Sequence, residues 1–272
     1  MGFTACGIVT LTTDFGHQGP FVAVMKGQVL TRFPQARIID FTHEIVVHWP
    51  AEAGFWLARS YRYFPAGTVH VAVVDPGVGS SRDIIAIEAG DHVFLAPDNG
   101  LLAPIYAGVA AGMGPVRAFR LDNEFLYKLR LPRPSATFHG RDIFAPVAAD
   151  LAAGRYPPES LGPRVEELVP SWVDDPVETR DQVSGIIITV DHFGNLITNI
   201  EARAIQRFRQ PIVRTGNHEF AVRRTYADVK PGEYLALVNS FDVVEIARAE
   251  QSAAEGLGIG RGSPVVVHDR IP

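Results

Sequence analysis

A carboxylate and a guanidinium that can act as a pair stand at the two ends of one short polar loop. Asp75 closes the apolar run THVAVV, and Arg82 lies seven residues further along, after Gly77 and Gly79. The two glycines permit a tight turn, so the loop can return Arg82 beside Asp75 and hold the carboxylate ionised. A structural Asp–Arg pair in a turn fits the same spacing. The lysine of a phosphate-binding P-loop is absent.

Three more polar segments stand where a strand should end. Asp14, in TTDFG, can accept hydrogen bonds from two vicinal hydroxyls such as those of a ribose, or it can cap a helix. His139 lies between an aromatic residue and a glycine, which fits a positioned imidazole as well as ordinary packing. Asp98 and Asn99 precede Gly100, and this pattern predicts a structural turn.

The second half of the chain has two comparable segments. Asn195 follows a very apolar run and can offer a donor and an acceptor to an adenine edge, while Phe193 offers a stacking face. Asn239 and Ser240 end another run, where a hydroxyl and main-chain amides can hold a carboxylate. Hairpin turns explain both segments equally well.

The first half alternates strand-like and helix-like patterns. This alternation predicts an α/β domain with a mainly parallel sheet, and ligands bind such sheets at the carboxyl ends of the strands. We expect strands over residues 7–12, 36–41, 68–74 and two around Gly90-Asp91, and helices over 20–33 and 51–64.

After a proline-rich stretch the pattern changes to short strands separated by Gly, Asn and Pro. It predicts a smaller antiparallel β-barrel or sandwich with one helical interruption near residues 202–208. The expected domains are 1–165 and 183–272, joined by a connection over 166–182. The strands are expected over residues 183–190, 212–215, 219–225, 234–238, 243–247 and 264–268.

Composition excludes several classes of protein. The net charge of -5 argues against nucleic acid as a partner, because such proteins carry a basic patch; the arginines near 203–209 are expected to be solvated surface. The single cysteine, Cys6, excludes an intramolecular disulfide and a cysteine-rich metal site. No apolar run reaches about 18 residues and no leader-like segment begins the chain, so we expect a soluble cytoplasmic protein without a membrane partner.

Taken in order, these segments resemble the S-adenosyl-L-methionine hydrolase (adenosine-forming) family, also called SAM hydroxide adenosyltransferases. The family is related to the enzymes that make 5′-fluoro- or 5′-chloro-5′-deoxyadenosine. The resemblance runs from TLTTDFG to NSFDVVEIA and so covers almost the whole chain. It implies that Asp75, Arg82 and His139 form the hydrolytic triad and that Asp14 binds the ribose.

The resemblance also implies the remaining contacts of the nucleoside. Trp49 is similar to a tryptophan that walls the nucleoside pocket in the halogenating relatives. Phe193 and Asn195 match an adenine-contacting FGN segment, and Glu245 is a weaker candidate for the adenosine end.

At the methionine end, the resemblance places Asp191 near the amino group and Ser240 on the carboxylate side. Phe241 follows Ser240 where the fluorinating relative has an arginine, which sets this chain apart. The resemblance further implies an N-terminal α/β domain, a C-terminal β-barrel and a homotrimer. Each ligand would lie between one subunit's first domain and its neighbour's second.

The expected reaction is in-line displacement at C5′ of the ribose by water or hydroxide. The sulfonium leaves as a neutral thioether, so neither a metal nor a cofactor is expected. Three alternatives stay open: a halide-using relative, a non-catalytic adenosyl-binding trimer, and a metal-dependent hydrolase. The last would use Asp14, Asp75, Asp98 and His139, which suit oxygen–nitrogen coordination, but no HxH or HExxH spacing supports it.

Overall fold

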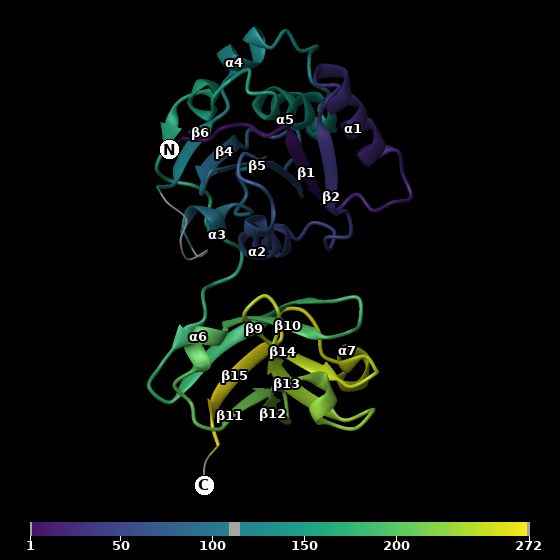
Figure 1. Cartoon of the computed structure of the whole chain (residues 1–272), viewed down its shortest axis with the longest axis vertical. Helices are drawn as coiled ribbons and strands as arrows, with labels where there is room; N and C mark the ends of the chain where they lie inside the picture. Colours follow the sequence, from purple (N-terminus) through teal and green to yellow (C-terminus); the bar gives the residue numbers. More distant parts are fainter. Residues whose placement is uncertain (1, 109–114, 271–272) are drawn as a thin grey trace. The chain divides into compact units, whose positions relative to one another are not determined.

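The computed structural model describes residues 2–108 and 115–270 (Figure 1). The chain divides into two compact units, Met1–Trp172 and Val173–Pro272. Their boundary falls inside the stretch 166–182 that the sequence predicts as a connection.

The first unit is built on a seven-stranded sheet in the order β2-β1-β3-β5-β4-β6-β7. Strands β2, β1, β3 and β5 are parallel, and β4, β6 and β7 extend the sheet in antiparallel pairing. The α/β prediction is therefore confirmed, with an antiparallel extension. The strands are β1 (Ile8–Thr13), β2 (Arg37–Thr42), β3 (Val69–Val73), β4 (Ile84–Ala89), β5 (His92–Pro97), β6 (Arg117–Arg120) and β7 (Arg164–Val165).

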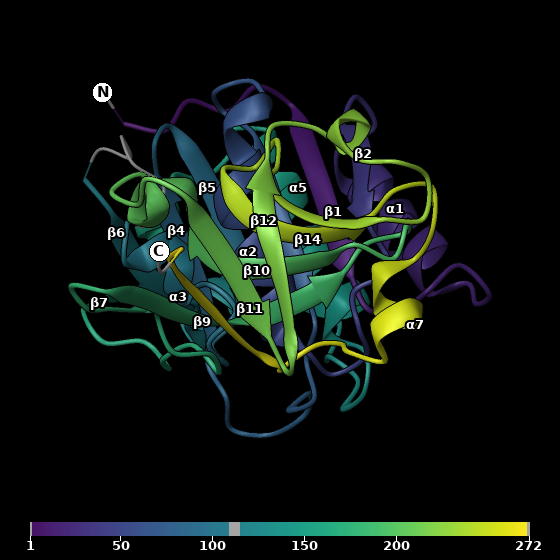
Figure 2. The same ribbon diagram turned by 90° about the horizontal axis from the view of Figure 1, so that it is seen from below.

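Helices cover both faces of this sheet (Figures 1 and 2). Met25 of one helix packs with Leu11 in one apolar core, and Leu57 of another packs with Ala72 in a second core on the opposite face. Strands covered on both faces need no alternation of polar residues, which explains their unbroken apolar runs. The helices are α1 (Phe21–Arg32), α2 (Pro50–Ser60), α3 (Ala103–Tyr106), α4 (Asn123–Lys128) and α5 (Ala145–Ala152), with short turns η1 (Tyr61–Tyr63), η2 (Gly140–Phe144) and η3 (Pro158–Leu161).

The helices over 20–33 and 51–64 were expected from periodicity, and α5 was not. The expected helix over 51–64 ends as an α-helix at Ser60 and continues as the 3-10 turn η1. Every residue of α5 is buried, so its sequence APVAADLA has no polar face from which a helical period can be recognised.

The second unit is a closed β-barrel, as predicted. Seven strands follow the order β10-β14-β13-β12-β11-β15-β9, and β9 pairs again with β10 to close the ring. The edge strand β8 pairs with β9 outside the ring. The elements are β8 (Val177–Glu178), β9 (Gln182–Val190), β10 (Leu196–Glu201), α6 (Ala202–Ile205), β11 (Pro211–Thr215), β12 (His218–Arg223), η4 (Tyr226–Asp228), β13 (Tyr234–Val238), β14 (Val243–Arg248), α7 (Ala253–Leu257) and β15 (Pro264–Asp269).

The barrel differs from the expectation in two details. Strand β10 was not expected, because Thr198 and Asn199 interrupt its apolar pattern. Strands β12 and β13 pair in parallel, whereas the other pairs of the ring are antiparallel. The 3-10 turn η4 lies between them, so this connection is longer than a hairpin and can bring the chain back to run in the same direction.

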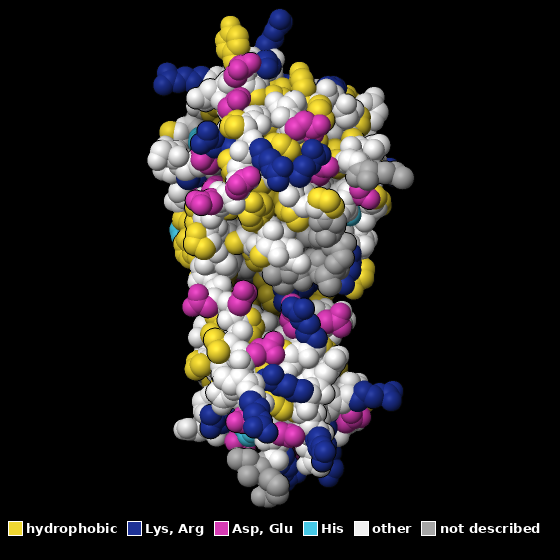
Figure 3. Space-filling model, turned by 90° about the vertical axis from the view of Figure 1, so that its left-hand side faces the viewer, with side chains coloured by type: hydrophobic (Ala, Val, Ile, Leu, Met, Phe, Trp, Pro, Cys, Tyr) yellow, Lys and Arg dark blue, Asp and Glu magenta, His cyan; other side chains and the backbone are white. Residues whose placement is uncertain are grey.

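No helix in the part of the chain that the structure describes is long and apolar enough to span a bilayer. Lys and Arg side chains are interspersed with Asp and Glu over the face drawn in Figure 3. This mixture differs from the basic stripe that is typical of nucleic-acid-binding surfaces.

Candidate active site

Three predicted residues reach the same edge of the first unit's sheet. Asp14 follows β1 and Asp75 follows β3, and these two strands are parallel neighbours with Thr13 opposite Val73. Trp49 lies between β2 and α2. The carboxyl ends of parallel strands meet at one edge, so the fold places these residues where open α/β sheets bind ligands.

Arg82 joins the predicted triad into one hydrogen-bonded chain. Its Nε donates to Oδ1 and Oδ2 of Asp75 at 3.1 and 2.9 Å, and Nη2 also donates to Oδ2. The same Nη2 donates to Nδ1 of His139 at 2.8 Å. The side chains of Asp75 and Arg82 are only 4% and 10% exposed, so the pair is shielded from bulk water.

Two glycines permit close packing around the triad. Gly79 has φ +80°, and a Cβ there would lie 2.2 Å from the carbonyl oxygen of Ala136, on the segment that leads to His139. Gly140 opens the π-helical turn η2 directly after His139, and its Cβ would lie 3.0 Å from Sδ of Met25. Single π-turns often occur at functional sites.

Hydrogen bonding determines the protonation of His139. A guanidinium can only donate, so Nδ1 of His139 must accept, and the proton of the neutral ring resides on Nε2. Burial lowers the pKa of His139, and the charge of Arg82 lowers it further. The ring is therefore neutral at pH 7, and Asp75 is the member of the triad with a lone pair available to take a proton.

Asp14 is held from one side only. Its Oδ2 accepts the N–H of His48 at 3.0 Å, and His48 adopts a left-handed backbone conformation with φ +61°. Oδ1 accepts no hydrogen bond from the residues that the structure describes. That oxygen can accept a ligand hydroxyl, as the sequence predicts.

A second tryptophan stands beside Trp49. The ring of Trp172 meets that of Trp49 edge to face, with the centroids 6.0 Å apart. Nε1 of Trp172 donates to the carbonyl oxygen of Asn99 at 2.8 Å, and Asn99 donates to that of Val74. Asn99 thus has the structural role expected of it. Trp172 was not anticipated, because it stands alone in the proline-rich stretch.

In the second unit, Asp191 organises the turn between β9 and β10. Its Oδ1 accepts the main-chain N–H groups of Phe193 and Asn195, both at 2.9 Å, and its Oδ2 accepts Nδ2 of Asn195. Phe193 is 74% exposed, so its ring face is available. The turn presents an aromatic face beside an oriented amide.

Glu245 is buried near this turn and accepts hydrogen bonds from two neighbouring side chains. It is 2% exposed and accepts the hydroxyl of Tyr226 at 2.7 Å and Nδ2 of Asn239 at 3.1 Å. Burial raises the pKa of Glu245 against the effect of these two bonds, and the charge of Asp191 raises it further. Ser240 is exposed directly after Asn239. Tyr226 was not anticipated; its only sequence signal is an aromatic residue in a turn.

The structure thus brings together Asp75, Arg82 and His139 by direct contact and places Asp14 and Trp49 on the same sheet edge. It places the second-unit candidates in the turn between β9 and β10, in the turn between β13 and β14, and, for Glu245, on β14, which pairs with β10 and β13. Among the described residues, no group of three or more His, Cys, Asp or Glu side chains is arranged to hold a metal ion. The four residues of the metal-dependent alternative are not such a group.

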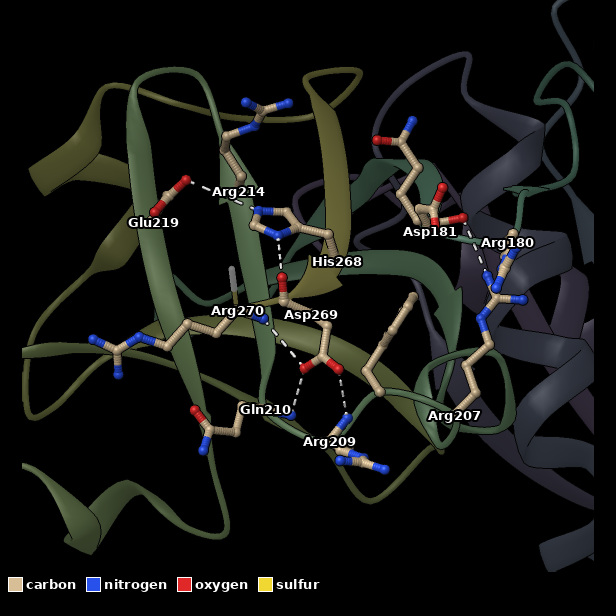
Figure 4. Close-up of a pocket in the computed structure, with 12 residues that line it drawn as sticks. Arg180, Asp181, Arg207, Arg209, Gln210, Arg214, Glu219, His268, Asp269 and Arg270 are labelled. Carbon is tan, nitrogen blue, oxygen red and sulfur yellow. Dashed lines mark hydrogen bonds and ion pairs between the residues drawn. The ribbon is translucent and has the colours of Figure 1, made fainter. Parts of the chain in front are cut away.

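A cavity of about 1330 Å³ in the second unit lies apart from these candidates (Figure 4). It is lined by arginines and acids, but by none of the predicted site residues. Its charges are partly balanced, because Arg214 stands opposite Glu219 across β11 and β12. Asp269 is occupied by the main-chain N–H groups of Arg209 and Gln210. The cavity presents mainly solvated charges.

Comparisons with known proteins place this geometry in a family. Residues 9–162 match the model of the SAM hydroxide adenosyltransferase N-terminal domain, and residues 185–266 match that of the C-terminal domain. The chain is 39% identical to a protein of Salinispora tropica named (R)-S-adenosyl-L-methionine hydrolase, over 93% of this chain and 95% of that protein.

Two further relatives show the range of similarity. A crystal structure of an uncharacterized conserved protein from Thermotoga maritima is 35% identical, with a TM-score of 0.85 over 97% of this chain and 100% of that one. A fluorinase of Nocardia brasiliensis is 26% identical over 96% of both chains. With both domain models matched in order over nearly the whole chain, this protein belongs to the SAM hydroxide adenosyltransferase family.

Proposed function

We propose that this protein hydrolyses S-adenosyl-L-methionine to adenosine and L-methionine. The observation that carries the proposal is the shielded chain from Asp75 through Arg82 to His139. Its geometry suits the activation of one water molecule, and the relative from Salinispora tropica is named for hydrolysis of this sulfonium.

The reaction is an in-line displacement at C5′ of the ribose. The oxygen of water forms a bond to C5′ while the C5′–S bond breaks and its electron pair stays on sulfur. Methionine leaves as a neutral thioether and needs no acid. Nε2–H of His139 orients the water, the charge of Arg82 stabilises its developing hydroxide character, and the carboxylate of Asp75 takes the proton.

In the proposed trimer, the nucleoside is held by residues of one subunit's first unit and of a neighbouring subunit's second unit. Oδ1 of Asp14 accepts the ribose hydroxyls and Trp49 walls the nucleoside. Phe193 stacks on the adenine, and Asn195 reads its edge with the amide that Asp191 orients.

The methionine end of the substrate is held by fewer side chains than the nucleoside. Asp191 pairs with the amino group and Ser240 binds the carboxylate, with Phe241 in place of a possible arginine. Recognition of the carboxylate therefore depends on the hydroxyl of Ser240 and on main-chain N–H groups. Glu245 supports the turn that carries Ser240 through its hydrogen bond with Asn239, and it supports the adenosine end through its hydrogen bond with Tyr226.

We also propose a cytoplasmic homotrimer that completes each site at a subunit interface and works without a cofactor. Light scattering coupled to size-exclusion chromatography tests the trimer. Turnover that persists after exhaustive chelation with EDTA supports chemistry without a metal. Loss of turnover that Mg²⁺ or Zn²⁺ restores would contradict it.

The direct test of the function is incubation of the purified protein with S-adenosyl-L-methionine and chromatography of the products. Adenosine and methionine should form in equal amounts, and the Asp75→Asn variant should release far less. The two sulfonium epimers are assayed separately, because the relative's name specifies the (R) form. A protein that binds the substrate but releases nothing is the non-catalytic alternative.

A halide-using activity is the second candidate, and the similarity to a fluorinase favours it. The same assay is repeated with added chloride or fluoride. The hydrolytic proposal predicts adenosine under all conditions, whereas accumulation of 5′-halo-5′-deoxyadenosine would establish the alternative.

A further inference from the structure

A hydrogen-bonded relay, buried except at Asp40, connects the end of β1 with β2 and the loop that follows β2. Oγ1 of Thr13 lies 2.9 Å from Nδ1 of His43, and Nε2 of His43 lies 2.9 Å from Oδ1 of Asp40. The main-chain N–H of Phe15 donates to Oγ1 of Thr13 at 3.2 Å. Nζ of Lys26 donates to Oδ2 of Asp40 at 2.6 Å.

The donor and the acceptor of each of these hydrogen bonds can be assigned, starting from Asp40. Burial would raise the pKa of Asp40, but hydrogen bonds from Lys26 and His43 outweigh it and lower the pKa, so Asp40 is ionised and can only accept. His43 therefore donates from Nε2 and accepts at Nδ1, and the hydroxyl of Thr13 donates to it. With a neutral imidazole the relay has one fully satisfied arrangement, which makes it rigid.

Burial separates this relay from the chemistry. Thr13 is 0% exposed and His43 is 1% exposed, so neither can touch a substrate. The acid, imidazole and hydroxyl are in the order of a nucleophilic triad, but a hydroxyl without access cannot attack. Their effect must act through a neighbour.

That neighbour is Asp14, which lies between Thr13 and Phe15, two residues that the relay holds by hydrogen bonds. The N–H of Gly16 donates to the carbonyl oxygen of His43 at 2.8 Å, which fastens the same loop a second time. The N–H of His48 then reaches Oδ2 of Asp14 from the far end of the His43 loop. The relay thus fixes both the backbone of Asp14 and the donor that orients its carboxylate.

We propose that His43, with Thr13 and Asp40, is a positioning group that aims Asp14 at the ribose hydroxyls and so sets the preference for ribose over deoxyribose. The inference rests on the proposed function, because it assumes that Asp14 binds the sugar of the substrate.

The chain contains a matched control for the relay. Thr10, also on β1 and 0% exposed, has Oγ1 at 2.9 Å from Nδ1 of His70. That imidazole contacts His92 in the core, and no hydrogen bond joins the pair to Asp14. Thr10→Val and Thr13→Val therefore remove the same kind of buried contact from one strand, but only the second lies beside the site.

The experiment compares kcat/KM for S-adenosyl-L-methionine and for its 2′-deoxyribose counterpart. The wild type should prefer ribose by on the order of 10–100-fold, as expected for a hydrogen bond to a charged group. Thr13→Val should lower this ratio about tenfold, toward that of Asp14→Ala, because a small misplacement of a binding group is costly. Thr13→Ser should restore the ratio, and Thr10→Val should keep it.

Equal ratios in Thr13→Val and Thr10→Val would overturn the inference, even if both variants melt earlier. If Thr13→Val does not fold, Asp40→Ala breaks the relay at its exposed end and should lower the ratio as well. An unchanged ratio in that variant would also overturn it.

A binding measurement separates this inference from the proposed function. Calorimetry compares adenosine with 2′-deoxyadenosine and needs no turnover. If the wild type releases no adenosine, the proposed function fails, while a preference for adenosine that Thr13→Val loses and Thr10→Val keeps still supports the relay. Equal preferences in these two variants would overturn the relay whether or not the enzyme turns over.

Discussion

Nη2 of Arg82 donates to Nδ1 of His139 at 2.8 Å, and this contact assigns different roles to the members of the triad. With Nδ1 occupied by a donor, the neutral imidazole presents Nε2–H rather than a lone pair to its surroundings. His139 is then a group that orients water, and Asp75 is the base. The resemblance names both residues as members of the triad but does not divide these roles between them.

Two substitutions of His139 should therefore differ. In His139→Gln the side-chain amide can place an N–H near the position of Nε2, whereas in His139→Asn the shorter side chain keeps an acceptor for Arg82 but leaves water without its donor. The Asn variant should lose on the order of 10²–10⁴-fold in kcat. The Gln variant should be at least about tenfold more active than the Asn variant. Steady-state kinetics checks this order, and equal losses in both variants would contradict the donor role of Nε2.

The pH dependence of kcat/KM follows from the same contact. Protonation of His139 would put a donor at Nδ1 against the guanidinium of Arg82, so the active form is the neutral one. Burial and then Arg82 lower the pKa of His139 below its ordinary value of 6.5. Activity should therefore stay constant through pH 7 and fall only as the pH drops through a value below 6.5. A fall in kcat/KM that begins at a pH above 6.5 in the wild type and is absent from His139→Gln would contradict the assignment of a neutral His139.

Gly79→Ala should disable the site by separating its two loops. The new Cβ would lie 2.2 Å from the carbonyl oxygen of Ala136, and φ is +80°. We expect kcat/KM to fall about 10²-fold, since displacement by about 1 Å can cost that much. Gly262→Ala is the control, because Gly262 has the same φ with nothing within 4 Å of the added Cβ. Equal losses in both variants would attribute the effect to backbone strain alone.

Phe193→Ala should weaken substrate binding without destabilising the barrel. The ring is 74% exposed, so its removal opens no internal cavity. Stacking on a base is worth about 1–3 kcal/mol, which corresponds to roughly a 5–150-fold rise in KM with kcat largely kept. Tyr127→Ala, at a residue 86% exposed on α4, is the control for loss of a surface aromatic side chain. An unchanged KM would remove Phe193 from the site.

Contacts within one short loop can be predicted from the sequence more readily than contacts between segments that only the fold brings together. Asp75 and Arg82 lie within one glycine-containing loop, so their pairing follows from local chemistry. His139 is 57 residues from Arg82, and no spacing rule brings it there. Only the resemblance to a family did so.

The same limit applies to the positioning groups. His43 gives no signal in THEI, because its importance arises when β2 pairs with β1 and brings its ring to Thr13. Tyr226 likewise reaches Glu245 only after the barrel strands have paired. Strand and helix patterns report burial and period, but the side-chain partners depend on register, which the patterns of single segments leave open.

Turnover in ¹⁸O-labelled water tests the central claim that an activated water attacks C5′. The wild type should place the label in the 5′-hydroxyl of adenosine and none in methionine, and Asp75→Asn should do so far more slowly. Unlabelled adenosine, or label recovered in methionine, would contradict the mechanism.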